Sequence, residues 1–330
     1  MSFSLGEIEQ KFVTLDGEVP NRIEALTPEA SARRYFRIYY PKRKLILSKD
    51  VQYQHDYVEV SKFLQKNHIS VPQIIKTDES NHLMLLSDAG EKDLTSVSDD
   101  SQYRDYLMDL IQTIARMQEL QPEEPVINRL FDYEKLNYEN QFTLSAFDRF
   151  SKRFNIEIVL RPEVKIFMEE ASAYLGQYPV KVFCHRDYHS RNILLSDEGK
   201  LTLIDFQDAR MGTPFYDLAS LLYDAYRPIP FSMRQGLYLH FQRFLDPNLP
   251  KAKECFYLQC LQRSYKALGS YFMLVTDKGF DKYRISLLNC LENLLEIVQV
   301  GLFPDHLFVF FHLLRKELMN DKDFMSLVES

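Results

Sequence analysis

Alternating hydrophobic and polar residues dominate the first part of the chain. Residues 34–40 alternate and are rich in tyrosine, residues 41–44 mark a turn, and residues 45–47 return, which predicts a β-hairpin. Apolar residues with helical spacing follow at Val58, Phe63 and Leu64 and end near Asn67, which predicts a helix. Strand-like runs come next at 71–75 and 82–86. The pattern up to residue 87 therefore predicts a small, β-rich lobe.

From residue 88 onward the apolar spacing becomes that of helices. Tyr106, Leu107, Leu110 and Ile114 share one helical face. The run 302–314 contains Pro304 and is too short to span a membrane, so it predicts a buried terminal helix. Together with the first lobe, these patterns predict an α+β fold with two domains, 1–87 and 88–330. The further helical patterns lie at 163–174, 218–225, 233–244, 254–274 and 283–300.

Three oxygen-bearing side chains carry the candidate chemistry. Asp187 precedes Asn192 by five residues, and Asp205 lies thirteen residues further on, with apolar strand-like runs at 193–195 and 201–204 between them. A carboxylate near an acceptor hydroxyl, followed by an Asn and an Asp that hold Mg²⁺, is the layout of a phosphoryl-transfer centre. We expect structural roles for His185 and for Asp217, whose carboxylate is placed to accept backbone N–H groups of the catalytic loop.

Several segments carry a resemblance to known kinases, namely 31–37, 85–88, 185–192, 204–209 and 216–221. On these the chain resembles the aminoglycoside-phosphotransferase-like family of protein-kinase-like enzymes. Within the family, 188–191, 206–209 and 262–263 resemble the bacterial kinases that phosphorylate the anomeric hydroxyl of N-acetylmuramate and N-acetylglucosamine during cell-wall recycling. The resemblance implies a bilobal kinase fold, with a nucleotide-binding N-terminal lobe and a helical catalytic and substrate lobe. It also implies ATP and Mg²⁺ as cofactors.

The resemblance implies a role for each matching residue. Asp187 orients the sugar hydroxyl and takes its proton late, while Asn192 and Asp205 hold the metal. His189 and Arg191 are equally explained as solvated loop residues, and Asp208 faces either the substrate or a second metal. The nucleotide candidates are Ser31, Arg33, Arg34, Leu86, Ser87 and Asp88. The acceptor candidates are His189, Arg191, Asp208, Tyr223, Asp224 and Arg263, and Tyr226, Arg227 and Gln262 are further candidates for the acceptor cleft.

The chain departs from the general kinase pattern at the phosphate-gripping lysine. Ser48 occupies the usual lysine position and Lys49 lies one residue out of register, which turns its side chain to the opposite face of the strand. Tyr57 stands where the helix normally supplies the ionic partner, and Glu59 is two residues further on. The sugar-kinase subgroup likewise lacks this lysine. The lost charge is then expected from Arg33, Arg34 or Arg37.

Only twelve positions separate Asp205 from Asp217, which leaves no room for the peptide-docking segment of a protein kinase. The sequence therefore predicts an ATP-dependent kinase of a small molecule, with an N-acetylated amino sugar as the favoured acceptor. Two alternatives stay open. One is a kinase of another small alcohol or an aminoglycoside on the same fold, and the other is a nucleotide-binding pseudokinase, which the missing Lys–Glu pair motivates.

Composition narrows the partners and the location. The formal net charge of −7 is spread without long like-charged runs, so we expect neither nucleic acid nor a membrane surface as partner. The first ten residues lack the pattern of a signal peptide, and the four cysteines form no CxxC pair. We expect a cytoplasmic protein with reduced thiols, monomeric or weakly homodimeric.

Overall fold

The computed structural model describes residues 6–15, 17–26, 33–301 and 303–328, which form two compact units. Unit 1 takes in the described residues up to Ser96 together with Glu123–Pro125 and Asn192–Asp208, and unit 2 takes in Val97–Pro122, Val126–Arg191 and the described residues from Ala209 onward. Asp187 thus belongs to unit 2, and Asn192 and Asp205 to unit 1. The units are defined by contacts and do not test the predicted functional lobes, 1–87 and 88–330, which stay a prediction.

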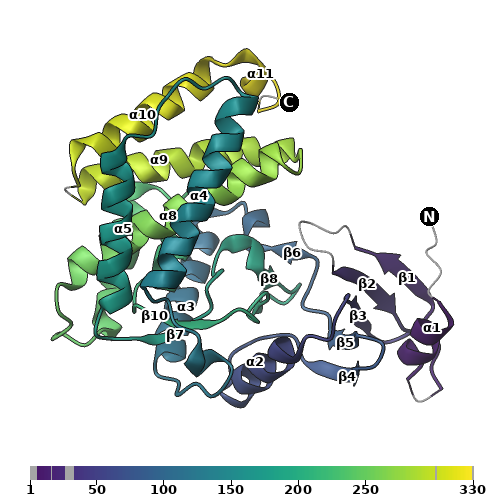
Figure 1. The fold of residues 1–330 in the computed structure, drawn as a ribbon. Helices are drawn as coiled ribbons and strands as arrows, with labels where there is room; N and C mark the ends of the chain where they lie inside the picture. Colours follow the sequence, from purple (N-terminus) through teal and green to yellow (C-terminus); the bar gives the residue numbers. More distant parts are fainter. Residues whose placement is uncertain (1–5, 16, 27–32, 302, 329–330) are drawn as a thin grey trace. The chain divides into compact units, whose positions relative to one another are not determined.

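The main sheet of unit 1 is antiparallel. The predicted hairpin is confirmed, because β2 and β3 pair with Tyr35 opposite Ser48 and Phe36 opposite Leu47. The predicted helix is also confirmed and ends at the cap residue Asn67. In the order of the sheet the strands are β1 (Arg22–Ala25), β2 (Arg34–Tyr39), β3 (Lys44–Lys49), β5 (Leu83–Ser87) and β4 (Ile74–Asp78), and the helices of this unit are α1 (Glu7–Val13) and α2 (His55–Lys66) (Figure 1).

The two faces of this sheet carry different side chains. On one face Phe36, Leu47 and Leu85 join Phe12 of α1 in a buried apolar cluster. Because side chains alternate along a strand, the cross-strand pair Tyr35 and Ser48 occupies the other face. The sheet therefore has an apolar face covered by α1 and a second face, called the polar face below, on which the nucleotide candidate Leu86 also lies.

One predicted strand begins later than expected. The apolar run 71–75 predicted a strand, whereas β4 begins at Ile74. Pro72 has no N–H to donate to a ladder, and the backbone N–H of Gln73 bonds the side-chain oxygen of Ser87 at 2.8 Å. The ladder with β5 starts after these residues.

A second, smaller sheet of unit 1 contains the segments that flank the candidate metal ligands. It consists of β6 (Lys92–Asp93), β8 (Ile193–Leu195) and β9 (Leu201–Leu203) in the order β6-β8-β9. The backbone N–H of Leu203 bonds the carbonyl of Ser70 at 2.9 Å. Phe206 stacks on Tyr57 of α2, with ring centroids 4.8 Å apart. The β8–β9 hairpin is thereby fixed to α2 and the segment after it.

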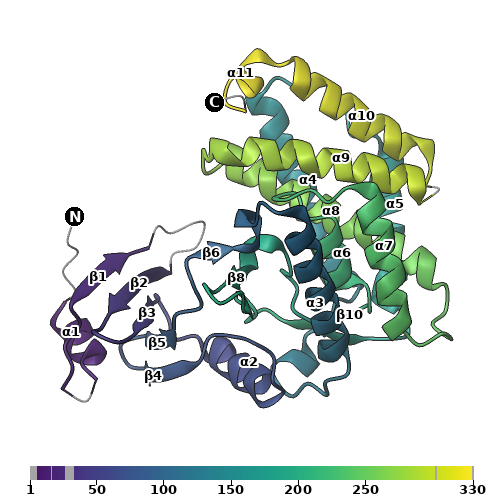
Figure 2. The ribbon, with the colours of Figure 1, turned by 180° about the vertical axis from the view of Figure 1, so that it is seen from behind.

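Unit 2 is helical apart from one short strand pair, β7 (Val182–Cys184) with β10 (Arg210–Gly212). Local sequence sets several helix starts, since Asp99 and Asp132 accept backbone N–H bonds from Gln102 and Lys135 and so cap α3 and α4. The helices are α3 (Asp100–Gln118), α4 (Tyr133–Arg153), α5 (Pro162–Gln177), α6 (Tyr216–Leu222), α7 (Phe231–Phe241), α8 (Ala252–Thr276), α9 (Arg284–Val300), α10 (Asp305–Asn320) and α11 (Lys322–Met325) (Figures 1 and 2). Single turns of 3₁₀ helix lie at Leu94–Ser96 in unit 1, at Ser190–Asn192 where the units meet in the chain, and at Val126–Asn128, Gln242–Phe244 and Asp281–Tyr283 in unit 2.

The centre of unit 2 is α8, which packs against α4, α6 and α9. Its approach to α4 is close, because a Cβ added at Gly269 would lie 2.7 Å from the Cα of Thr143. The terminal helix predicted near 302–314 is confirmed as α10, with Leu307, Phe311 and Leu314 buried. Among the helices in the described ranges, none is long and apolar enough to cross a membrane.

Candidate active site

Asp217, at the start of α6, shapes the catalytic loop of unit 2. Its two carboxylate oxygens accept the backbone N–H groups of His185 at 2.7 Å and Arg186 at 3.0 Å, which confirms the role predicted for it. Arg186 has a φ of 83°, a left-handed conformation that is uncommon for a residue other than glycine. Burial raises the pKa of Asp217 to about 7, although the two N–H bonds act in the opposite direction. His185 is fully buried, edge-on to Tyr188.

Asp187 follows this strained residue and is surrounded by cationic side chains. Its Oδ1 accepts from Nη2 of Arg263 at 3.0 Å and lies 3.6 Å from Nζ of Lys266. Burial alone would raise the pKa of Asp187, but Lys266, Arg263 and Arg186 outweigh burial and hold that pKa well below the usual range of an aspartate. Asp187 is therefore ionised at neutral pH and is held in place by two residues of α8.

A small cavity of about 80 Å³ opens beside Asp187 within unit 2. It brings together six of the predicted residues, namely Asp187, His189, Tyr223, Asp224, Tyr226 and Arg263. It also adds residues that the sequence did not single out, namely Lys266, Ser270 and Tyr271 of α8. Helical spacing could have identified Lys266, since it lies three residues after Arg263 on the same helix face.

The surroundings of two lining residues determine the protonation of one and the hydrogen bonds of the other. Burial lowers the pKa of His189 to about 3, so its imidazole is neutral at physiological pH, and the ring lies against Tyr226 with centroids 5.2 Å apart. Asp224 is buried and accepts the backbone N–H groups of Ser190 and Tyr226, each at 2.8 Å, together with the Ser190 hydroxyl. The Asp224 carboxylate therefore fixes the loop that carries the site.

The remaining acceptor candidates do not line this cavity. Arg191 donates to the Tyr283 hydroxyl at 3.1 Å and stacks over Tyr226, and Arg227 lies 3.5 Å over the ring of Tyr103. Gln262 is fully buried and donates to Glu139 of α4 at 3.0 Å. None of the three lines the cavity beside Asp187. Asp208 is exposed and belongs to unit 1.

The candidate metal ligands meet at one end of the β8–β9 hairpin in unit 1. Ile193 pairs with Leu203, and the N–H of Ile204 bonds the carbonyl of Asn192 at 3.0 Å, so Asn192 and Asp205 leave the hairpin at the same end. Asp205 has a φ of 66°, and such strain is concentrated at functional sites. An amide oxygen and a carboxylate fit Mg²⁺, which proteins bind through one or two side chains together with phosphate oxygens.

The polar face of the main sheet carries a candidate replacement for the kinase lysine. Lys49 pairs with Glu9 of α1 on the opposite face, as its register predicted, and Ser48 is buried. On the polar face, Arg33 donates to Asp50 at 2.8 Å and to the Tyr35 hydroxyl at 3.0 Å.

The electrostatic surroundings of Tyr57 place this arginine near Asp205, one of the two candidate metal ligands. Burial raises the pKa of Tyr57, and the charges that act on its hydroxyl come from Tyr35, Arg33 and Asp205. These side chains therefore lie near one another. Arg34 alternates to the face that carries Lys49, and Ser31 lies outside the described residues. Arg33 is thus the best-placed cation for a phosphate near Asp205.

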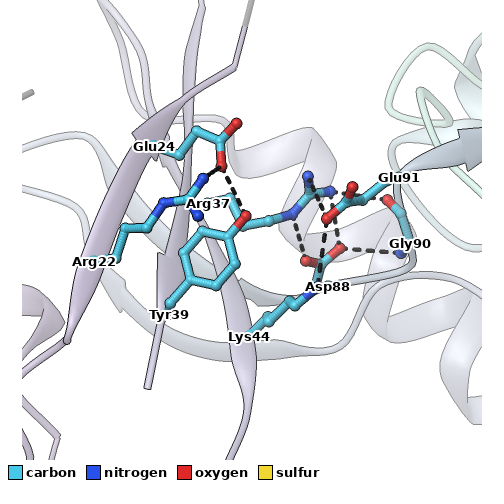
Figure 3. A network of polar contacts seen from close by, with 8 residues as sticks. All are labelled: Arg22, Glu24, Arg37, Tyr39, Lys44, Asp88, Gly90 and Glu91. Carbon is cyan, nitrogen blue, oxygen red and sulfur yellow. Dashed lines mark hydrogen bonds and ion pairs between the residues drawn. The ribbon is translucent and has the colours of Figure 1, made fainter. Parts of the chain in front are cut away.

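The segment after β5, predicted to hold the adenine, is tied to β2. Arg37 donates from Nε to Asp88 at 2.6 Å and from Nη2 to the carbonyl of Gly90 at 3.0 Å, and Glu91 lies 3.3 Å from Nη1 (Figure 3). Gly90 has a φ of 115°, and a Cβ there would lie 2.6 Å from the carbonyl oxygen of Leu195. The charge of Arg37 is therefore used where β5 ends, next to the adenine candidates Leu86, Ser87 and Asp88.

The chain belongs to the phosphotransferase enzyme family, whose sequence profile matches residues 22–255. It is a phosphotransferase that acts on an alcohol group. It is similar to the N-acetylmuramate/N-acetylglucosamine kinase of Pseudomonas aeruginosa, with 29% identity over 302 residues that cover 81% of each chain. The kinase of the same name from Neisseria meningitidis is 26% identical, and the alignment covers 78% of this chain and 79% of the relative. These relatives confirm the resemblance stated from the motifs.

Solved structures confirm the kinase-like α+β fold. The choline kinase LicA from Streptococcus pneumoniae superposes with a TM-score of 0.62 at 12% identity, covering 89% of this chain and 98% of its own. The gentamicin complex of APH(2'')-IIa gives a TM-score of 0.59 at 13% identity, covering 93% and 99%. At these identities the likeness shows the fold alone.

Proposed function

We propose that the chain transfers the γ-phosphoryl group of ATP to the anomeric hydroxyl of an N-acetylated amino sugar, such as N-acetylmuramate or N-acetylglucosamine. The names of the relatives support the acceptor. Adenine nucleotides in solved structures of the same fold, the AMP complex of LicA and the ADP-bound APH(2'')-Ib, support the donor.

The observation that carries the proposal is the pair of cations beside Asp187. Arg263 and Lys266 both approach its carboxylate, and both line the cavity. Asp187 compensates one of these two positive charges, and the carboxylate of Asp224 at the same cavity is bonded to the backbone N–H groups of Ser190 and Tyr226. The second positive charge at the cavity disfavours a cationic acceptor, such as choline or an aminoglycoside. The charges therefore favour a neutral sugar or one that carries a carboxylate.

Asp187 supports the transfer by position. With its pKa held low by Lys266, Arg263 and Arg186 against burial, the carboxylate is ionised and accepts the hydrogen bond of the acceptor hydroxyl. In a loose phosphoryl-transfer transition state the proton leaves late, so alignment of the nucleophile matters more than basicity. An anomeric hydroxyl is more acidic than an ordinary alcohol, which suits a weakly basic partner.

The candidate residues of unit 1 bind the nucleotide in this proposal. Asn192 and Asp205 would hold Mg²⁺, which neutralises charge on the phosphates when bound. Arg33 takes the part of the absent lysine and contacts phosphate oxygens through its guanidinium. The backbone of residues 86–88, held in place by the Arg37–Asp88 pair, hydrogen-bonds the adenine.

The test is ATP consumption across N-acetylmuramate, N-acetylglucosamine, glucose, choline and an aminoglycoside. Turnover with the N-acetylated sugars is expected, and turnover with only choline or the aminoglycoside would refute the acceptor assignment. Lys266→Met should lower kcat/KM for N-acetylmuramate about tenfold more than for N-acetylglucosamine. A difference of about tenfold is the usual effect of losing one charge-assisted hydrogen bond, here to the carboxylate of N-acetylmuramate. Lys253→Met, an exposed position on the same helix, is the matched control and should leave this ratio unchanged.

A further inference from the structure

A second and larger cavity lies in unit 2 among α7, α9 and α10. Its volume is about 590 Å³, against about 80 Å³ for the cavity beside Asp187, and ligand sites usually fall between about 300 and 1,000 Å³. Both views show α9 and α10 running side by side, and Figure 2 shows α7 close to them. The lining is polar and includes Arg234, Glu292, Asn293, Glu296 and Arg315. The two cavities share no lining residue.

The charges that line this cavity are already compensated within the protein. Arg234 pairs with Glu296 at 2.6 Å, and Arg315 pairs with Glu292. Arg234 is only 6% exposed, and its Nε has no hydrogen-bond partner in the described part of the chain. A guanidinium offers five donors and a carboxylate about four acceptor positions. The ion pairs therefore leave hydrogen-bonding capacity at the cavity without leaving net charge.

An aromatic pair adds a flat surface at the same cavity. Phe308 and His312, one turn apart on α10, are stacked with centroids 5.6 Å apart and planes 13° from parallel. Both line the cavity, and His312 is exposed. An aromatic face next to charged and amide groups of zero net charge is suited to the apolar face and the hydroxyls of a sugar ring.

We propose that this cavity is a second ligand site, separate from the acceptor site, for a neutral carbohydrate. A charged ligand would have to compete with one of the two ion pairs. A neutral polyhydroxyl ligand binds the donors and acceptors that these pairs leave available, and stacks on Phe308.

The second site is connected to the acceptor cavity through the segment after α6. Asn293 donates to the carbonyl of Tyr223 at 3.0 Å, and Asn289 donates to the carbonyl of Ala225 at 3.0 Å. Arg234 lies 4.6 Å over the ring of Tyr223. Tyr223 and Ala225 line the acceptor cavity, while Asn289, Asn293 and Arg234 line the second one. A ligand at the second site therefore changes acceptor affinity, and by linkage the acceptor changes the affinity of that ligand.

The experiment measures binding of maltose, cellobiose and N,N′-diacetylchitobiose to the full chain by saturation-transfer NMR and titration, with glucose 6-phosphate as the charged comparison. At least one neutral disaccharide should bind. Gln299→Leu and Phe308→Ala, which alter two lining residues, should each weaken binding about tenfold, the loss of one good contact. Leu313→Ala, at an exposed position of α10, and Lys266→Met in the acceptor cavity should leave it unchanged.

Three results would overturn the proposal. They are no binding of any neutral disaccharide, binding of the phosphate sugar alone, and binding that is lost in Lys266→Met but kept in both second-cavity variants. The bound disaccharide should also change the KM of the acceptor in the wild type and not in Gln299→Leu, and an unchanged KM would refute the connection between the sites. Binding is measured without turnover, so its failure is distinguishable from failure of the proposed phosphoryl transfer.

Discussion

Arg263 of α8 donates from Nη2 to Oδ1 of Asp187 at 3.0 Å. The same guanidinium donates from Nε to the Ser220 hydroxyl of α6 at 2.8 Å, so two helices fix its orientation. The arrangement holds the proposed catalytic carboxylate ionised and directed at the cavity, at the cost of basicity. The pH dependence of the reaction should therefore change when Arg263 is replaced.

The acid side of the kcat/KM profile should lie unusually low. The cations hold the pKa of Asp187 well below the usual aspartate range, and a carboxylate with a depressed pKa loses its active, ionised form only as pH falls through that low value. We expect Arg263→Met to move the acid limb upward toward the ordinary aspartate pKa, and Arg263→Lys to move it less. An acid limb that stays in place in Arg263→Met would contradict this account of Asp187.

Asp217 should make the folded state less stable as pH rises. Burial raises its pKa from 3.8 to about 7, so between these values the folded protein binds a proton that the unfolded chain has released. The contribution of Asp217 to the free energy of unfolding is then present below about pH 4 and lost by about pH 7. Thermal unfolding across this range should show a smaller decline in Asp217→Asn than in the wild type. Identical pH dependence in the two proteins would exclude the raised pKa.

Gly269 is required for the packing of α4 on α8. Because a Cβ at this position would lie 2.7 Å from the backbone of Thr143, we expect Gly269→Ala to reduce the free energy of unfolding by about 1–3 kcal/mol, the usual cost of overpacking. Gly236 of α7 has nothing within 4 Å of its added Cβ. Gly236→Ala is the matched control, and it should stabilise by up to about 1 kcal/mol through helix propensity. Denaturant unfolding of both variants checks the contrast, and equal effects would refute it.

Arg33 and Arg34 provide a matched pair of neighbouring arginines. Arg33 shares the polar face with Tyr35 and Asp50, whereas Arg34 lies opposite Lys49 on the other face. If Arg33 contacts the phosphates, Arg33→Met should weaken binding of Mg·ATP about tenfold, and Arg34→Met should leave it near the wild-type value. Equal losses in both variants, or a loss only in Arg34→Met, would show that another group replaces the kinase lysine.

The sequence predicted those elements whose apolar spacing matches their burial. The β2–β3 hairpin, α2, α3 and α10 are of this kind, since their buried positions are apolar at strand or helix spacing. It did not predict α4. The buried face of α4 includes Glu139, Asn140 and Thr143, whose hydrogen bonds to α5 and α8 are formed only in the folded chain. The spacing of hydrophobic residues does not reveal a helix face that is buried through polar contacts.

For the candidate site, local pattern identified the loop residues and missed their surroundings. The motif named Asp187, Asn192 and Asp205 as candidates, and the strand register correctly predicted that Lys49 turns away from the polar face. Lys266 and the bonding of Asp224 to Ser190 were not predicted, because both depend on the tertiary packing of α6 and α8 around the loop. Gln262 was interpreted as a cleft residue, and its burial against Glu139 shows how little the type of a polar residue reveals about its direction.

The proposed division of roles between Asp187 and Asp205 is tested by measuring turnover and the Mg²⁺ dependence of nucleotide binding in two variants. We expect Asp187→Asn to bind Mg·ATP like the wild type while its turnover falls about 10²-fold or more. We expect Asp205→Ala to lose the gain in nucleotide affinity that Mg²⁺ provides. Unchanged turnover in Asp187→Asn, or intact Mg²⁺-dependent affinity in Asp205→Ala, would refute these roles.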